Sequence, residues 1–261
     1  MPYSKTVWDE NTAITPARLN NLEKQYDEAM ADAITEAKQE IQYYVSPTGS
    51  DSNAGTSAAP FKTIQKAVNE AYKAIAGRVR INIAAGTYTE NIKIENMMCP
   101  EVFFYGADKT TTIISGDIDI SNAQCIRLYR LTIRDQDYGV VSANGLKKLK
   151  MDDVIIDNVT IAGVYIKATE MVEINNSSID AGGNAIDCST VGTLCAVSVE
   201  ISSVQTHGIA ISRGTFAYTW GLTGNIGTVP VHSVSGSILI KGTSSITGGA
   251  DETSIGGQIF E

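Results

Sequence analysis

The chain has 261 residues, a formal net charge of −9 at pH 7 and 43% hydrophobic residues. This length is ample for a buried core in one or two domains, and an acidic chain without a basic stripe argues against nucleic acid or an anionic membrane surface as partner. Because no run of about 18 apolar residues exists and the polar start MPYSKTVWDENTAITP lacks the features of a secretory signal, we expect neither membrane insertion nor secretion.

The first predicted element is a long helix over residues 15–42. Thr15 offers an N-cap oxygen, Pro16 suits the first helical position, and the segment contains no glycine. Apolar residues recur at steps of three or four, with the hendecad period. We expect these residues to mediate oligomerisation: Leu19, Leu22, Tyr26, Met30, Ile34, Ala37 and Ile41. Since the other faces are polar, we predict a homotrimer, with a single helix lying on its own β domain as the alternative.

A second, shorter helix is predicted over residues 61–76. A loop rich in Ser, Asp, Asn and Gly precedes it, in which Asp51 and Asn53 are able to bond the backbone, and Gly77 ends the helix. The loop has no closing glutamate of the EF-hand kind, so we expect no metal there. The apolar face of this helix suits a cap over the first coil of a repetitive β structure.

The chain after Gly77 contains repeats built from short β segments. Segments with apolar residues five apart start at Leu128, Met151, Ile174 and Val199, and a second segment follows each, at Tyr138, Gly163, Asn184 and His207. A repeat of about two dozen residues without a helix is one coil of a solenoid. We therefore predict an all-β, right-handed parallel β-helix domain over residues 43–261, with regular coils from about Ile81, after an N-terminal attachment arm and oligomerisation helix over residues 1–42.

The cysteines and histidines do not form a metal site in the sequence. There is no C-x-x-C spacing, and the two histidines lie apart from any cysteine cluster. We expect reduced, mostly buried thiols and no metal or cofactor. The residues concerned are Cys99, Cys125, Cys188, Cys195, His207 and His232.

One candidate catalytic group follows from the repeat alignment. Asp157 and Asp180 occupy equivalent positions on successive coils, and Arg134 lies one coil away, with Gln205 at the fourth position. Two stacked carboxylates are able to act as acid and nucleophile on a glycosidic bond. The alternative, which we favour, is a solvated charge ladder on the surface.

One candidate binding group lies in residues 213–232, a segment that interrupts the repeat. Phe216, Tyr218 and Trp220 alternate there, so on a strand they would line one face. Exposed rings of this kind stack on sugars, and we expect carbohydrate binding; a subunit interface and a lid over the last coils are the alternatives. The neighbouring side chains expected to hydrogen-bond a sugar are Thr219, Thr223 and Asn225.

Residues 43–116 resemble a known family. The stretch YYVSPTGSDSNAGTSAAPFKTIQKAVNEA, followed by INIAAGTYTENIKI and YGADKTTTIISG, is similar to the N-terminal part of pectin-lyase-like right-handed β-helix proteins, and within them to pectin methylesterases. The resemblance implies a cap helix at PFKTIQKA and a first coil at AGTYTENI. The esterases' downstream aspartate-bearing and glutamine-bearing motifs are missing here, so no catalytic residue carries over.

Residues 7–29, VWDENTAITPARLNNLEKQYDEA, resemble the N-terminal segment of bacteriophage tail and baseplate appendage proteins. The matching residues are Trp8, Ile14, Thr15, Arg18, Leu19, Asn20 and Glu23. The resemblance implies a component of the virion tail that trimerises, attaches through this segment to other tail or baseplate proteins, and contacts host cell-wall carbohydrate. Two alternatives stay open: a polysaccharide-degrading tailspike enzyme, either glycoside hydrolase or lyase, and a bacterial carbohydrate-binding surface protein.

Overall fold

The computed structural model describes residues 15–16, 20–28, 40–73, 77–204, 206–226, 229–234, 236–241, 245–247, 250–254 and 258–260. The chain divides into two compact units, Met1–Gln39 and Glu40–Glu261. In the first unit residues 20–28 are helical, and Leu22 and Tyr26, one turn apart, are 36% and 65% exposed. The other predicted oligomerisation residues of this unit lie outside the described residues: Leu19, Met30, Ile34 and Ala37.

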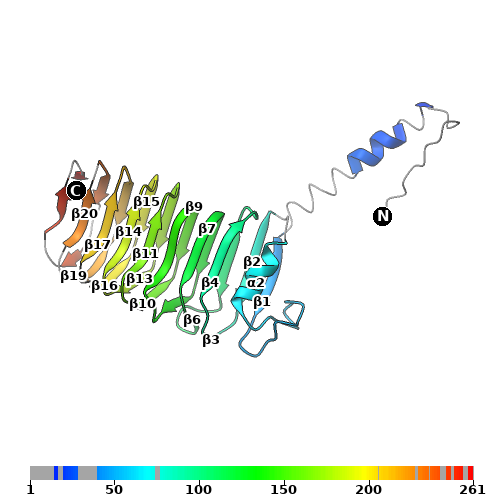
Figure 1. The fold of residues 1–261 in the computed structure, drawn as a ribbon, viewed down its shortest axis with the longest axis horizontal. Coiled ribbons are helices and arrows are strands. Elements are labelled where there is room, and N and C mark those ends of the chain that lie inside the picture. Colours follow the sequence, from blue (N-terminus) through cyan, green and yellow to red (C-terminus); the bar gives the residue numbers. More distant parts are fainter. Residues whose placement is uncertain are drawn as a thin grey trace. The chain divides into compact units, whose positions relative to one another are not determined.

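The second unit is a parallel β-solenoid whose coils each contribute one strand to three faces (Figure 1). Face A carries β1 (Glu40–Val45), β2 (Arg78–Ile83), β5 (Val102–Gly106), β12 (Met171–Asn175), β15 (Thr193–Val197), β18 (Phe216–Trp220), β21 (Ile238–Lys241) and β24 (Gln258–Phe260). Face B carries β4 (Ile92–Met97), β11 (Ala162–Lys167), β14 (Asn184–Ser189), β17 (His207–Ser212), β20 (Val229–Val234) and β23 (Glu252–Ser254).

Face C is a separate eight-stranded sheet, whereas faces A and B form one sixteen-stranded sheet. The two faces are joined because β7 (Ile118–Tyr129) and β9 (Tyr138–Asp152) run from face B into face A without a break. Face C carries β3 (Gly86–Tyr88), β6 (Thr112–Ser115), β8 (Thr132–Arg134), β10 (Ile155–Val159), β13 (Ser178–Ala181), β16 (Glu200–Val204), β19 (Thr223–Ile226) and β22 (Ser245–Thr247).

Strand pairing on face A fixes the length of one coil. Phe104 pairs with Leu128, Leu128 with Met151 and Met151 with Ile174, which gives steps of 128−104=24, 151−128=23 and 174−151=23 residues. The predicted alignment of Leu128, Met151 and Ile174 is therefore confirmed.

The fourth aligned segment was misplaced. Ile174 pairs with Ala196 and not with Val199, because Ala196 and Ile201 are also apolar and five residues apart, and this coil is only 196−174=22 residues long. Val199 instead directly precedes β16 on face C.

Residues with left-handed backbone turn the chain at the corners between faces. An L-residue pays about 1–2 kcal/mol in this conformation, so glycine, asparagine and aspartate are favoured there. After the face A strands the positive-φ residues are Arg130, Asp153, Asn176, Ser198 and Gly221. After the face B strands they are Asn96, Asn122, Gly145, Ala168, Thr190, Arg213 and Gly236. The same corner is thus repeated from coil to coil.

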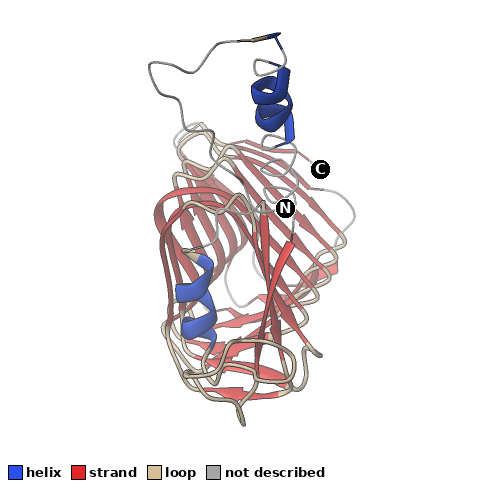
Figure 2. Cartoon of the chain, turned by 90° about the vertical axis from the view of Figure 1, so that its right-hand side faces the viewer, coloured by secondary structure: helices blue, strands red, loops and turns tan. Residues whose placement is uncertain are grey.

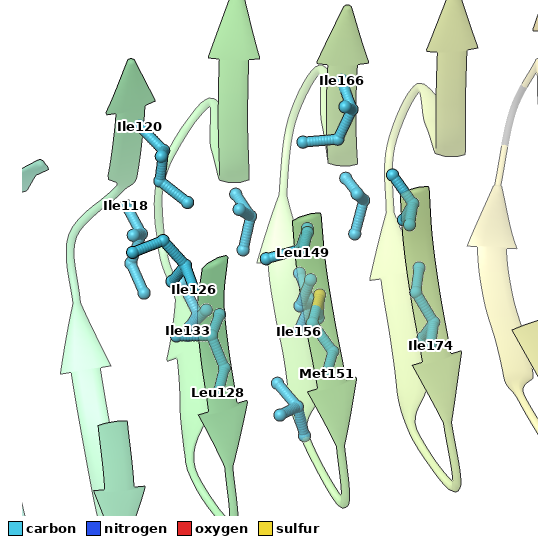
Figure 3. Packing of buried hydrophobic residues seen from close by; sticks show 14 of the residues in the cluster. Ile118, Ile120, Ile126, Leu128, Ile133, Leu149, Met151, Ile156, Ile166 and Ile174 are labelled. Atoms are coloured by element: carbon cyan, nitrogen blue, oxygen red, sulfur yellow. The ribbon is translucent and has the colours of Figure 1, made fainter. Parts of the chain in front are cut away.

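Inward side chains of the three faces fill one continuous core. Figure 3 shows part of this core, stacked from coil to coil, and labels Ile118, Ile120, Ile126, Leu128, Ile133, Leu149, Met151, Ile156, Ile166 and Ile174. All are at most 1% exposed. Because a coil buries these groups only against its neighbours, the stack is stable as a whole and not coil by coil.

The cap helix α2 (Ile64–Ala71) is confirmed but is shorter than the predicted 61–76. It packs against β1, β2 and β4 and buries Ile64, Ala67, Val68 and Ala71; Figure 2 shows it, as the lower blue helix, at the near end of the coils. Phe61 does not join the helix, because it forms a bridge to Val45 and is buried there. The predicted residues 74–76 lie outside the described residues.

The solenoid begins earlier than predicted. Glu40–Val45 pairs in parallel with β2, so the first helix does not extend to residue 42, and regular strands precede Ile81. Ile41, predicted to belong to the oligomerisation helix, lies in β1 and packs partly against the core. The physical reason is the sequence EIQYYV, whose β-branched and aromatic residues favour a strand once a partner strand is present.

Candidate functional site

The outer surface of face A carries residues in columns, because parallel pairing places equivalent side chains about 4.8 Å apart on successive coils. One column contains Tyr44, Asn82, Tyr105, Tyr129, Asp152, Asn175, Val197 and Trp220. A second contains Gln42, Arg80, Phe103, Arg127, Lys150, Glu173, Cys195, Tyr218, Ile240 and Phe260. The charged residues of these two columns lie from Arg80 to Glu173, and beyond Glu173 both columns are uncharged.

The predicted binding residues lie together at the uncharged end. Phe216, Tyr218 and Trp220 are the outward residues of β18, 40%, 38% and 48% exposed, while Ala217 and Thr219 between them are buried. The strand prediction, with all three rings on one face, is therefore confirmed. Exposed Ile238, Ile240 and Phe260 continue the apolar surface on the next two strands.

Residues 213–232 do not interrupt the repeat, contrary to expectation. β18 pairs in register with β15 and β21, so it is an ordinary coil strand and not a lid over the coils. Thr219 points inward and its hydroxyl is buried, so it is not available to a sugar. Thr223 is exposed but belongs to β19 on face C, and the Asn225 side chain lies outside the described residues.

The predicted catalytic group lies on face C. Asp157 pairs directly with Arg134, and Asp180 is on the next coil, but the ladder between β10 and β13 shifts register after Ile156. Asp180 pairs with Ser202, not with a residue at the predicted position 205. All three charged side chains are half-exposed, and Arg134 makes its ion pair with Asp135, Nε to Oδ2, at 2.9 Å.

An aromatic cluster at the charged end of face A was not predicted. Tyr105 and Tyr129 have ring centroids 5.0 Å apart, and Phe103 lies 5.5 Å from Tyr105 in an edge-to-face arrangement and 6.2 Å from Tyr129. The Arg80 guanidinium stacks 4.0 Å from the Tyr105 ring centroid. The available signal was the strand VFFYG, in which Phe103 and Tyr105 alternate with buried residues.

A groove of about 260 Å³ adjoins this cluster. Phe103 and Tyr129 line it on one side, and Lys150, Asp152 and Glu173 line it on the next coils. Lys150 Nζ lies 2.6 Å from Glu173 Oε2, and this hydrogen bond lowers the pKa of Glu173, more than partial burial raises it. Glu173 is therefore ionised at neutral pH and unsuited to donate a proton as a general acid.

Two further lining side chains are already engaged. Arg127 makes an ion pair with Glu101, and Asp152 Oδ1 accepts a hydrogen bond of 3.0 Å from Asn176 Nδ2. The groove thus presents the rings of Phe103 and Tyr129, the amide of Asn175 and paired charges. This arrangement is suited to holding a polar ligand.

The four thiols are free, as predicted; Cys99 and Cys188 are buried and Cys125 and Cys195 half-buried. Burial raises the pKa of each thiol, so all four are protonated at neutral pH. Among the described residues no group of three His, Cys, Asp or Glu side chains is arranged to hold a metal ion. No helix within those same ranges has the length and apolarity to cross a membrane.

The pectinesterase family profile matches residues 52–144, that is 144−52+1=93 residues, or about a third of the chain. The match covers the loop before α2, the cap helix and the first coils. Together with the parallel solenoid, it supports a pectin-lyase-like right-handed β-helix and relates the chain to proteins that act on pectin-type carbohydrate. No curated protein and no solved structure matches the chain.

Proposed function

We propose that this chain is a carbohydrate-recognition protein, serving as an appendage in the tail or baseplate of a bacteriophage or phage-like particle. The observation that carries the proposal is the row of three exposed rings on β18, Phe216, Tyr218 and Trp220. Sugars present apolar C–H faces between hydroxyl groups, and flat rings with polar edges stack on those faces. The relation to carbohydrate-acting β-helix proteins supports the same ligand class.

Assembly is the second part of the proposal. The phage-like segment over residues 7–29 attaches the chain to other tail or baseplate proteins, and the helix that contains Leu22 and Tyr26 joins three copies. The exposure of both side chains supports a partner on that helix. One exposed ring pair contributes only about 1 kcal/mol of binding free energy, so three linked copies raise the affinity for a repetitive polysaccharide through effective concentration.

The test compares a double variant that lacks two rings of β18 with a control variant that lacks two rings on another face. Tyr218→Ala with Trp220→Ala should keep the melting temperature and the molecular mass, but lose adsorption to immobilised bacterial cell-wall polysaccharides. Tyr138→Ala with Tyr165→Ala is the control, since these rings form a pair 5.5 Å apart on face B. If the first variant unfolds or dissociates, the rings of β18 are structural, and the binding assignment is wrong.

A second candidate is a polysaccharide-degrading enzyme. The pectinesterase match and the register of Asp157 with Arg134 favour it. The ion pair of Glu173 with Lys150 disfavours it, because it keeps the Glu173 carboxylate ionised and so unsuited to act as a general acid. Incubation with pectin and with cell-wall polysaccharides separates the candidates: methanol or new reducing ends, lost in Asp157→Asn, belong to an enzyme, whereas the leading proposal expects neither product.

A further inference from the structure

We propose that the charged end of face A holds a second saccharide site, separate from β18, that takes a neutral oligosaccharide. We call it the tyrosine groove and define it by its lining residues Phe103, Arg127, Tyr129, Lys150, Asp152, Glu173 and Asn175. The Tyr105 ring lies beside this lining, packed against Tyr129. This inference rests on the proposed function for its ligand class, a saccharide. It depends on different residues, however, and a separate experiment tests it.

Two rings, Phe103 and Tyr129, line the tyrosine groove, and Tyr105 supports Tyr129 from beside it. Tyr105 and Tyr129 follow each other in one outer column, and their rings are tilted by only 34° at 5.0 Å. Phe103 and the Arg80 guanidinium pack beside them, which fixes the ring orientation before any ligand arrives. Rings held in place by their neighbours lose little conformational entropy on binding, and this makes them effective stacking surfaces.

The same column then changes from rings to hydrogen-bonding groups. Asp152 and Asn175 follow Tyr129 on the next two coils, and both line the groove. A sugar that stacks on Tyr129 therefore meets a carboxylate and an amide about 5–10 Å further along the column. Acceptors and donors beside an aromatic platform suit the alternating apolar faces and hydroxyl rims of a saccharide chain.

The charges of the groove favour a neutral ligand. Its lining includes two cations, Arg127 and Lys150, and two carboxylates, Asp152 and Glu173. Both cations are neutralised within the protein, Lys150 by Glu173 at 2.6 Å and Arg127 by Glu101. A polyanionic chain would have to displace these carboxylates and leave them unpaired, whereas a neutral chain hydrogen-bonds to them in place.

The groove and β18 are distinct sites. Tyr129 and Trp220 are in the same column but four coils apart, through Asp152, Asn175 and Val197. Four steps of the parallel ladder amount to about 19 Å. The lining residue nearest to β18 in this column, Asn175, is two coils from Trp220, about 10 Å, with the uncharged strand β15 between them. We therefore expect a variant in one site to leave the other intact.

The test uses the full chain and a panel of immobilised neutral hexasaccharides built from glucose, galactose, mannose or N-acetylglucosamine, with hexagalacturonate as the polyanionic comparison. Tyr105→Ala with Tyr129→Ala should weaken binding to the recognised neutral member about tenfold or more. Tyr105→Phe with Tyr129→Phe, which keeps the rings, should retain binding. Tyr218→Ala with Trp220→Ala should leave this binding unchanged, and so should the face B control.

Three results would overturn the proposal: no binding to any neutral member, binding to hexagalacturonate alone, or binding that the Tyr105 and Tyr129 variants do not weaken. Circular dichroism and the melting temperature of each variant guard against loss of fold. If the alanine pair unfolds, the phenylalanine pair and Asp152→Ala replace it; the second should weaken binding without removing a ring, and unchanged binding in it would then count against the site.

Discussion

At the residue scale, the Asp51 side chain stabilises the loop before α2 at the N-terminal end of the solenoid. Its carboxylate accepts hydrogen bonds from the Lys62 and Thr63 N–H groups, both at 2.9 Å, and from the Thr63 hydroxyl at 2.8 Å. Burial raises the pKa of Asp51, but these hydrogen bonds outweigh it, so the pKa is lowered. The ionised group therefore fixes the residues that begin α2.

Asp51→Ala should destabilise the protein by about 1 kcal/mol at pH 7, because its hydrogen bonds to Lys62 and to Thr63, the N-cap of α2, are lost. Because the folded pKa lies below the unfolded value of about 3.9, the stabilisation is present above that pH and is lost as the pH falls through the folded pKa. Urea midpoints of wild type and variant should thus differ at pH 7 and converge below pH ~3.9. The surface variant Asp119→Ala serves as control, and a gap that persists at low pH would contradict the assignment.

The role of Asp51 and Asn53 was predictable, whereas the tyrosine groove was not. Short polar side chains in a glycine-rich loop bond the nearby backbone, and Asn53 Nδ2 does donate to the Pro60 carbonyl at 2.9 Å. Tyr105 and Tyr129 meet only if the coils from β5 to β7 are in register, and the sequence alignment began one coil later, at Leu128. The shared face of the aromatic residues of β18, in contrast, was predictable from their alternation within a single strand.

At the scale of elements, the left-handed residues at the corners between faces turn the chain from one face to the next. Ala168 sits at such a corner with φ of 51°, and its side chain is exposed. Since a Cβ is unfavourable in the left-handed region, Ala168→Gly should be neutral or stabilise by up to about 1 kcal/mol, and Ala168→Val should destabilise by a similar amount. Thermal unfolding of both variants checks this.

Ala210 provides the control with the opposite sign. It is partly exposed and lies within strand β17, in register with Asp187 on one side and His232 on the other, where glycine only adds conformational freedom to the unfolded chain. Ala210→Gly should therefore lower stability by about 0.5–1 kcal/mol. If glycine destabilised both positions equally, corner strain would not be the reason for the left-handed columns.

Element boundaries were less predictable than element types. The sequence predicts a helix over residues 61–76 and the structure has Ile64–Ala71, because Phe61 is drawn into a bridge with Val45. Similarly, Glu40–Val45 has both helical spacing and strand composition, and only pairing with β2 decides between them. These choices depend on contacts between segments far apart in the chain, which local patterns do not contain.

At the scale of the whole molecule, the solenoid was predictable from its repeat, because a fixed coil length appears in the sequence itself. Assembly does not appear in this way, and it stays a prediction that depends on the first unit. Leu22 and Tyr26 lie four residues apart, on one side of the helical residues 20–28, and both are exposed. A short amphipathic helix is marginal alone, and we therefore predict that a partner covers this side.

The trimer is tested by comparing three chains. Full-length protein should have three times the monomer mass in light scattering, while Leu22→Asp and a chain that begins at Glu40 should be monomeric, since a charge cannot enter an apolar seam unpaired. Lys24→Ala is the control, because its side chain is 74% exposed and lies on another side of the helix. All four should keep the β-rich circular dichroism of the solenoid, which is a compact unit of its own. A full-length monomer would refute the trimer. A trimer that survives removal of residues 1–39 would place the assembly contacts in the solenoid, with the uncharged outer surface of β18 and β21 as the first place to look.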